Sequence, residues 1–266
     1  MARVTVAPGV ALNVEEAGTG GPPFVFVHGL ACDSTAWAPQ FADLARDHRC
    51  ISVNLRGRGG SDATGPFGVP QQAADVAAVM QELGCGPAVI VGHSLGGYVA
   101  LDLNQRHPEF VLGIVAGDSP IQRTGLGSAR LADMIDEAGD TAPLDRLLER
   151  FWTENTTPAV REYARSMMLG CPPAVAAGML RDDPSPDVLL AQLKAADQKP
   201  FMALWADPPI GDPAWFRAVC MLVRQEAVAG AGHFFQIEQP AVTNALLRAF
   251  LDDVERDPRL DKLGLR

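Results

Sequence analysis

Short, mostly apolar runs recur along the chain and predict buried β-strands. Each run has four to six residues, and several follow Gly or Pro residues that typically form turns. The runs are Phe24–Val27, Cys50–Val53, Ala88–Val91, Gly113–Ala116 and Phe201–Trp205, and a weaker sixth covers Val223–Val228. Runs that are apolar throughout, rather than alternating, indicate strands covered on both faces of a sheet.

Segments with helical spacing of apolar residues lie between these runs. Residues 37–47 carry apolar side chains at Trp37, Phe41, Leu44 and Ala45, which fall on one helix face. The same spacing predicts helices at 71–83, 95–106 and 241–254. Strands that alternate with helices favour an α/β fold with a mostly parallel sheet flanked by helices.

Residues 120–199 interrupt this alternation. Helical patterns cover 128–139, 144–152, 158–169 and 186–196, with no convincing strand among them. One parallel crossover needs only one helix, so we interpret the segment as an inserted helical cap. The predicted organisation is a core formed by 1–119 and 199–266, and a cap formed by 120–198.

Composition narrows the possible partners. The 266 residues are 47% hydrophobic and 20% charged, as in ordinary globular proteins, and the net charge is −10. This charge disfavours nucleic acid and anionic membranes. Five cysteines without a CxxC pair, and no clustered histidines, argue against a disulfide framework or a metal site. Without a leader-like N-terminus or a run of about 18 apolar residues, we expect a soluble cytoplasmic protein acting on a small molecule. Oligomeric state stays open.

The strongest motif is Gly92-His-Ser-Leu-Gly96, which directly follows a predicted strand and precedes a predicted helix. This is the context in which a G-x-S-x-G sequence forms a tight turn with an exposed serine. The glycines remove side chains that would collide in the turn, and the helix N-terminus favours negative charge nearby. Ser94 is therefore the candidate nucleophile.

A serine nucleophile needs a base and an oxyanion hole. Among five histidines, His233 lies in the small-residue loop Gly230-Ala-Gly-His233 after the last predicted strand, and this loop can reach Ser94. His93, next to the serine, is expected to point elsewhere. The backbone N–H groups of Leu95, directly after the nucleophile, and of Leu30, after Gly29, are the candidate oxyanion donors.

These motifs together resemble the α/β-hydrolase superfamily. The resemblance rests on Phe26–Gly29, on Asn54–Asp62, on the serine turn and on Gly230–His233, in the expected order. It implies an eight-stranded sheet, a helical cap after the sixth strand, the order Ser, acid, His, and Leu30 and Leu95 as oxyanion donors. Serine in the turn argues against haloalkane dehalogenases and epoxide hydrolases, which place Asp there.

The position of the acidic residue that would orient His233 departs from the superfamily pattern, and two aspartates are candidates for this role. The usual acid follows the strand at Phe201–Trp205, but there Asp207 lies two residues early and Asp212 is typical of a helix N-cap. Asp118 ends the preceding strand, where some branches carry the acid. One is the cofactor-independent dioxygenase branch, which the chain resembles at Val53–Gly57 and Lys199–Phe201. We favour Asp118, and Asp207 remains the competing acid.

The sequence thus predicts a carboxylic-ester hydrolase-like enzyme without metal or cofactor. It would cleave a small-to-medium apolar ester, thioester or lactone through an acyl-enzyme. The alternative keeps the fold but uses His233 as a general base for cofactor-free oxygenation, cyclisation or C–C cleavage. Apolar side chains in the cap would either line the substrate site or pack the cap, and these are Trp152, Met167, Met168 and Met179.

Overall fold

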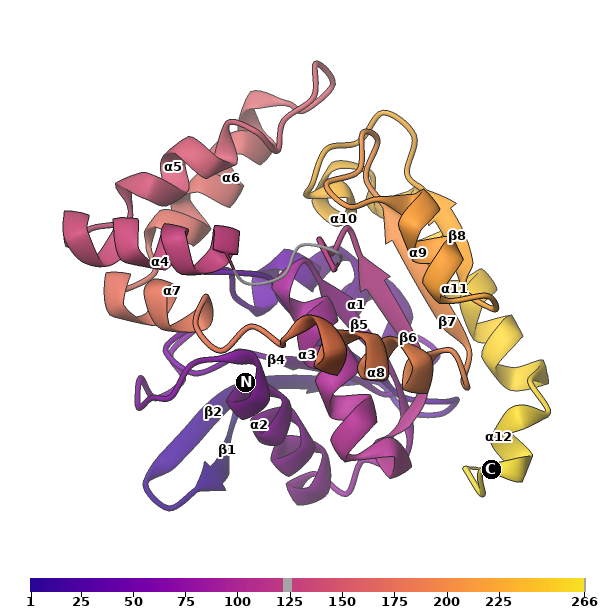
Figure 1. Cartoon of the computed structure of the whole chain (residues 1–266). Coiled ribbons are helices and arrows are strands. Elements are labelled where there is room, and N and C mark those ends of the chain that lie inside the picture. Colours follow the sequence, from indigo (N-terminus) through magenta and orange to yellow (C-terminus); the bar gives the residue numbers. More distant parts are fainter. Residues whose placement is uncertain (122–125, 266) are drawn as a thin grey trace.

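A single eight-stranded sheet forms the centre of the molecule (Figure 1). The computed structural model describes residues 1–121 and 126–265. The strand order is β1-β2-β4-β3-β5-β6-β7-β8. The strands are β1 (Ala2–Ala7), β2 (Val10–Ala17), β3 (Phe24–Val27), β4 (Cys50–Val53), β5 (Ala88–His93), β6 (Val111–Gly117), β7 (Phe201–Trp205) and β8 (Arg224–Ala227). The β1–β2 and β2–β4 pairs are antiparallel and all other pairs are parallel, which confirms the predicted fold class.

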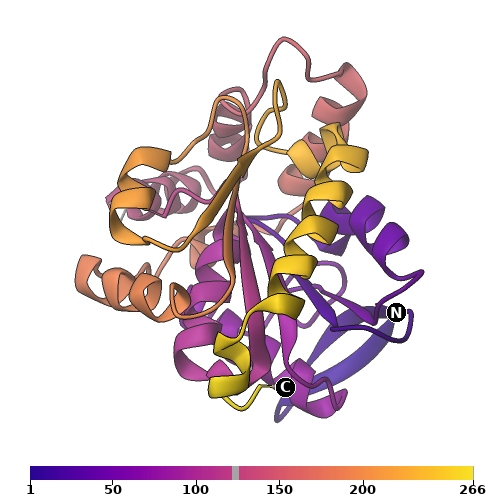
Figure 2. The same ribbon diagram turned by 90° about the vertical axis from the view of Figure 1, so that its right-hand side faces the viewer.

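Helices cover both faces of the sheet (Figure 2). The helices α2 (Val69–Glu82) and α3 (Leu95–Arg106) lie on one face, whereas α1 (Ala38–Leu44) and α11 (Pro240–Arg256) lie on the other. Strand β3 shows why its sequence is apolar throughout: Val25 and Val27 pack on the first side, and Phe24 and Phe26 pack on the second.

The remaining helices lie mostly between β6 and β7. There, α4 (Leu126–Ala138), α5 (Ala142–Leu148), α6 (Pro158–Leu169) and α7 (Pro173–Met179) form a group beside the sheet, and α8 (Pro186–Ala196) packs against α3 (Figure 1). The short helices α9 (Pro213–Val219), α10 (Phe235–Glu238) and α12 (Arg259–Lys262) complete the set, with 3-10 turns at Ser34–Trp37 and Pro108–Phe110. The division into a core and a cap at 120–198 stays a prediction, and 122–125 lie outside the described residues.

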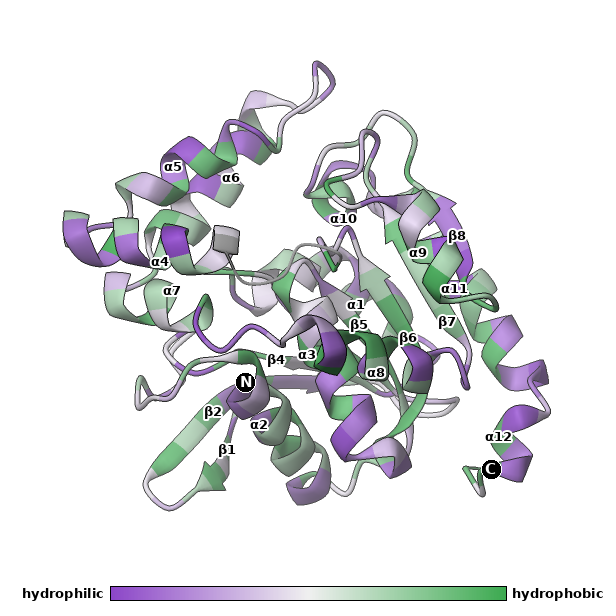
Figure 3. Ribbon diagram, in the orientation of Figure 1, coloured by the Kyte–Doolittle hydropathy of each residue, from purple (hydrophilic) through white to green (hydrophobic). Residues whose placement is uncertain are grey.

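Hydropathy distinguishes the central strands from the sheet edge (Figure 3). Strands β5, β6 and β7 are largely hydrophobic, whereas the edge strand β8 is hydrophilic, because its sequence is Arg-Gln-Glu-Ala. Within residues 1–121 and 126–265, none of the helices combines the length and apolar character that crossing a membrane requires.

Candidate active site

Ser94 occupies a strained turn between β5 and α3. Its φ of 53° and ψ of −116° place a residue with a side chain in a region that favours glycine. A Cβ on Gly92 would lie 2.1 Å from the Gly96 carbonyl oxygen, and a Cβ on Gly96 would lie 2.4 Å from the Val27 carbonyl oxygen. The Ser94 N–H donates to the Gly117 carbonyl at 2.7 Å, which holds the turn against β6. The turn predicted for the G-x-S-x-G motif is therefore present.

Asp118 and His233 are joined at the carboxyl end of β6. The His233 Nδ1 atom lies 2.7 Å from Asp118 Oδ2, and both side chains are buried, with exposed fractions of 3% and 0%. Asp118 is itself strained, with a φ of 38°. Its second oxygen accepts from the N–H groups of Ile210 (3.1 Å) and Ala206 (3.3 Å). The carboxylate is thus fixed by the loop after β7 while it contacts the histidine ring.

Asp207 has a different set of contacts. Its side chain is exposed, and Oδ2 accepts from the Gly230 N–H at 3.0 Å. The Asp207 N–H donates to the Ala231 carbonyl at 2.8 Å. Asp207 therefore braces the loop that carries His233 without contacting the imidazole. Asp212 caps α9 through the N–H groups of Ala214 and Trp215, as its sequence context predicts.

Two aromatic rings hold His233 in place, and sequence reasoning missed both. His93 was expected to point elsewhere, but its ring lies 4.5 Å from the His233 ring, centroid to centroid. Its Nε2 donates to the His233 carbonyl at 2.8 Å. Burial holds the pKa of His93 well below its ordinary value, so this ring stays neutral. The Phe151 ring lies 4.1 Å from the His233 ring, and the Phe151 carbonyl accepts from the His233 N–H at 3.0 Å.

The two residues that carry the candidate oxyanion donors lie in the wall of the cavity that contains Ser94. Leu30 and Leu95 both line this cavity. Across the described ranges, neither backbone N–H donates a hydrogen bond to a protein acceptor. For Leu95 the reason is its place as the first residue of α3, where N–H groups have no partner within the helix. Both N–H groups are therefore free to donate to another acceptor.

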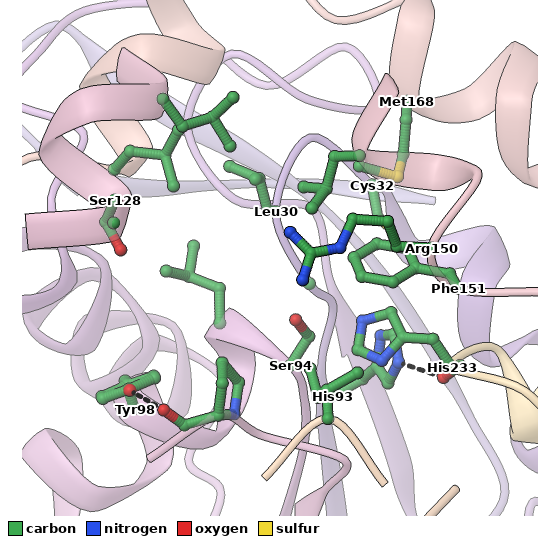
Figure 4. A pocket seen from close by; sticks show the side chains of 18 of the residues that line it. Leu30, Cys32, His93, Ser94, Tyr98, Ser128, Arg150, Phe151, Met168 and His233 are labelled. Carbon is green, nitrogen blue, oxygen red and sulfur yellow. Dashed lines mark hydrogen bonds between the residues drawn. The ribbon is translucent and has the colours of Figure 1, made fainter. Parts of the chain in front are cut away.

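The cavity over Ser94 has a volume of about 420 Å³. Ser94 and His233 line one wall, and residues from the segment between β6 and β7 line the opposite wall (Figure 4). The walls are mainly apolar, with polar groups from Cys32, Tyr98, Ser128, Arg150 and Asp183. Of the four apolar residues singled out in 120–198, Met168 lines the cavity, Met167 and Met179 are buried in packing, and Trp152 packs partly buried against the core.

Metal ligands are not gathered near this cavity. In the part of the chain that the structure describes, no group of three or more His, Cys, Asp or Glu side chains could hold a metal ion. The polar side chains that line the cavity carry hydroxyl, thiol, imidazole, guanidinium and carboxylate groups. This set suits nucleophilic attack on a carbonyl group.

Comparison with known proteins places the chain in a family. The model of the alpha/beta hydrolase family matches residues 24–246, so the chain belongs to this family. Over 111 residues it is 35% identical to 2-(acetamidomethylene)succinate hydrolase from Mesorhizobium japonicum, which covers 41% of this chain and 39% of that protein. The chain thus spans about two fifths of the length of that relative.

Solved structures match over much more of the chain. An esterase from Thermogutta terrifontis, described as malate bound, superposes with a TM-score of 0.82 and 28% identity, covering 96% of this chain and 99% of that one. The enol-lactonase from Burkholderia xenovorans has a TM-score of 0.81 at 22% identity, covering 93% and 99%. The second likeness concerns the fold alone. Together the similarities support an alpha/beta hydrolase enzyme.

Proposed function

We propose that the protein is a serine hydrolase that cleaves a small-to-medium ester, thioester or lactone through an acyl-enzyme. The observation that carries this proposal is the short, buried contact between His233 Nδ1 and Asp118 beside the strained Ser94 turn. An acid, a histidine and a serine that line one site can activate the serine hydroxyl as a nucleophile.

The roles of the three side chains follow from their chemistry. Asp118 accepts a hydrogen bond from the Nδ1–H group of His233, which leaves Nε2 as the ring atom that can take a further proton. When the Ser94 oxygen forms a bond to the substrate carbonyl carbon, its proton passes to Nε2. Asp118 then stabilises the imidazolium ion. The alcohol or thiol leaves with that proton, and water activated by His233 releases the acid and regenerates Ser94.

The oxyanion is the second requirement of this mechanism. Each addition step turns the carbonyl oxygen into an anion, which needs donors that are already in place. The N–H groups of Leu30 and Leu95 supply them in our proposal, since both line the cavity with Ser94. The α3 N-terminus adds the positive end of its dipole beneath the same position.

The substrate class rests on the cavity and on the relatives. A space of about 420 Å³ with mainly apolar walls suits a small-to-medium acyl or alcohol group. The structural relatives include proteins described as an esterase and as an enol-lactonase, and a sequence relative is named a hydrolase. All three names are consistent with attack on a carbonyl group of an ester or amide type.

Hydrolysis of short 4-nitrophenyl esters tests the proposal. We expect the wild-type protein to release 4-nitrophenol and Ser94→Ala to lower kcat by about 10³-fold or more, because the acyl-enzyme cannot form. Ser128→Ala is the matched control, since Ser128 lines the same cavity away from the strained turn and its loss should leave kcat nearly unchanged. Ester hydrolysis that survives Ser94→Ala would overturn the acyl-enzyme mechanism.

A further inference from the structure

One cation lines the cavity and is not used by the proposed mechanism. Arg150 follows α5, and its guanidinium is directed into the cavity that also contains Ser94 and His233 (Figure 4). The residue is exposed, so part of its side chain is in contact with solvent. The cavity walls are mainly apolar, and Arg150 and Asp183 are the two described lining residues with charged side chains apart from the histidines.

The guanidinium of Arg150 has no carboxylate partner among the described residues. The two acids that precede it most closely in the sequence, Asp145 and Glu149, are both bound to Arg165. Four described arginines make no side-chain hydrogen bond or ion pair within the described ranges, namely Arg130, Arg146, Arg150 and Arg217. Of these four, Arg150 is the one that lines the cavity. In a chain with 32 acidic and 22 basic residues, intramolecular carboxylates are abundant, yet this guanidinium remains available.

The backbone next to Arg150 is tied to the candidate catalytic histidine. The following residue, Phe151, accepts the His233 N–H through its carbonyl, and its ring packs at a tilt against the imidazole. A Cβ on Gly232 would lie 2.3 Å from that same carbonyl oxygen, so the two segments pack closely. The start of the Arg150 side chain is therefore held at a set position relative to His233, and its long stem spans part of the cavity.

We propose that Arg150 binds a carboxylate on the substrate, so that the preferred substrates are esters or lactones that carry a second, free carboxylate. This inference rests on the proposed function. A guanidinium forms two parallel hydrogen bonds to a carboxylate, which fixes orientation as well as adding binding energy. With the carboxylate held by Arg150, the reacting carbonyl lies across the apolar cavity at Ser94. Asp183, the other charged residue in the lining, already has an interaction of its own.

A matched pair of substrates isolates the carboxylate. Mono-4-nitrophenyl glutarate and 4-nitrophenyl pentanoate have acyl chains of the same length, and the free carboxylate distinguishes them. We expect Arg150→Met to reduce kcat/KM for the glutarate ester relative to the pentanoate ester by about tenfold or more, because a charge-assisted pair is lost. Arg146→Met, an exposed arginine without a partner one turn earlier, should keep the wild-type ratio.

Direct binding provides a readout that does not depend on turnover. We expect calorimetric titration to show that glutarate binds to the wild-type protein. Arg150→Met should weaken this binding by about tenfold or more, whereas Arg146→Met should leave it unchanged.

Equal substrate ratios or equal glutarate affinities in wild type and Arg150→Met would overturn the carboxylate assignment. An equal loss on both esters would do the same, since it would indicate a structural effect. If pentanoate ester hydrolysis does not depend on Ser94, the proposed function fails, and the calorimetry still tests Arg150.

Discussion

The two candidate acids, Asp118 and Asp207, differ in what their carboxylates contact. Asp118 is buried and holds the His233 ring, whereas Asp207 is exposed and holds the backbone of the His233 loop. The first contact can set the tautomer of the imidazole and stabilise its charged form. The second can position a loop, and an uncharged oxygen could do that equally well.

Asparagine substitutions separate these two roles. Asp118→Asn should lower kcat by about 10³- to 10⁴-fold, because an amide cannot stabilise the imidazolium and favours the wrong tautomer. Asp207→Asn should change kcat by less than about threefold, since its amide oxygen still accepts the Gly230 N–H. Steady-state kinetics on a 4-nitrophenyl ester measure both effects. A large loss in Asp207→Asn with near-normal Asp118→Asn would reverse the assignment.

Local sequence was sufficient to select Ser94 and His233 as candidates but not to choose the acid. The serine turn has a short motif, and the histidine stands in a small-residue loop between predicted elements. Asp118 and Asp207 both follow buried strands, so nothing adjacent in sequence distinguishes them. The distinction depends on a contact between residues 115 positions apart. His93 and Phe151 were missed for the same reason, because a ring that packs on His233 leaves no periodic signal.

At the scale of the elements, the strands that the sequence predicted most accurately are those that are buried on both faces of the sheet. Strands β3, β4 and β7 were predicted to the residue, because each is buried on both faces and apolar nearly throughout. The β1–β2 hairpin was not found among the apolar runs, because its residues alternate between buried and partly exposed positions. The helix α7 was missed because Pro173–Met179 consists mostly of small residues without a clear apolar face.

Arg58 binds two backbone segments that lie far apart in the sequence, one at Cys32 and one at 167–170. Its guanidinium is buried and donates to the Cys32 carbonyl (2.8 Å), the Met167 carbonyl (2.8 Å) and the Gly170 carbonyl (3.3 Å). Cys32 belongs to the loop that carries Leu30, and Met167 lies in the last turn of α6. One side chain therefore connects the candidate oxyanion loop to the helices between β6 and β7.

Removal of this guanidinium should destabilise the protein. Arg58→Met keeps much of the apolar stem but leaves buried carbonyls without donors, so we expect the free energy of unfolding to fall by about 3 kcal/mol. Arg130→Met, an exposed arginine without a partner in the described residues, should change it by less than about 0.5 kcal/mol. Urea unfolding followed by circular dichroism measures both. Equal midpoints for the two variants would show that Arg58 does not hold these segments together.

For the whole molecule, acidification has two opposing effects on the stability of the folded protein. The net charge of −10 falls in magnitude as carboxylates take up protons, which reduces repulsion within the folded protein. Against this, the buried ring of His28 resists protonation. Its Nδ1 donates to the Gly29 carbonyl (2.9 Å), and its Nε2 accepts from the Leu55 N–H (3.1 Å). A second ring proton would remove the acceptor for Leu55, and burial lowers the pKa of His28 to about 4.

This lowered pKa predicts how stability depends on pH. Below the ordinary value of 6.5 the unfolded chain binds a proton at His28 and the folded protein does not, so the free energy of unfolding falls as the pH falls. Between about pH 7.5 and about pH 5.5, both above the isoelectric point of about 4.9, His28 should account for a loss of about 1.3 kcal/mol. In His28→Gln this loss should disappear, because glutamine offers a donor and an acceptor without titrating. Comparing the two proteins across the same pH interval cancels the change in overall charge, which is common to both. Urea unfolding at the two pH values tests the prediction, and an identical pH dependence for wild type and His28→Gln would contradict it.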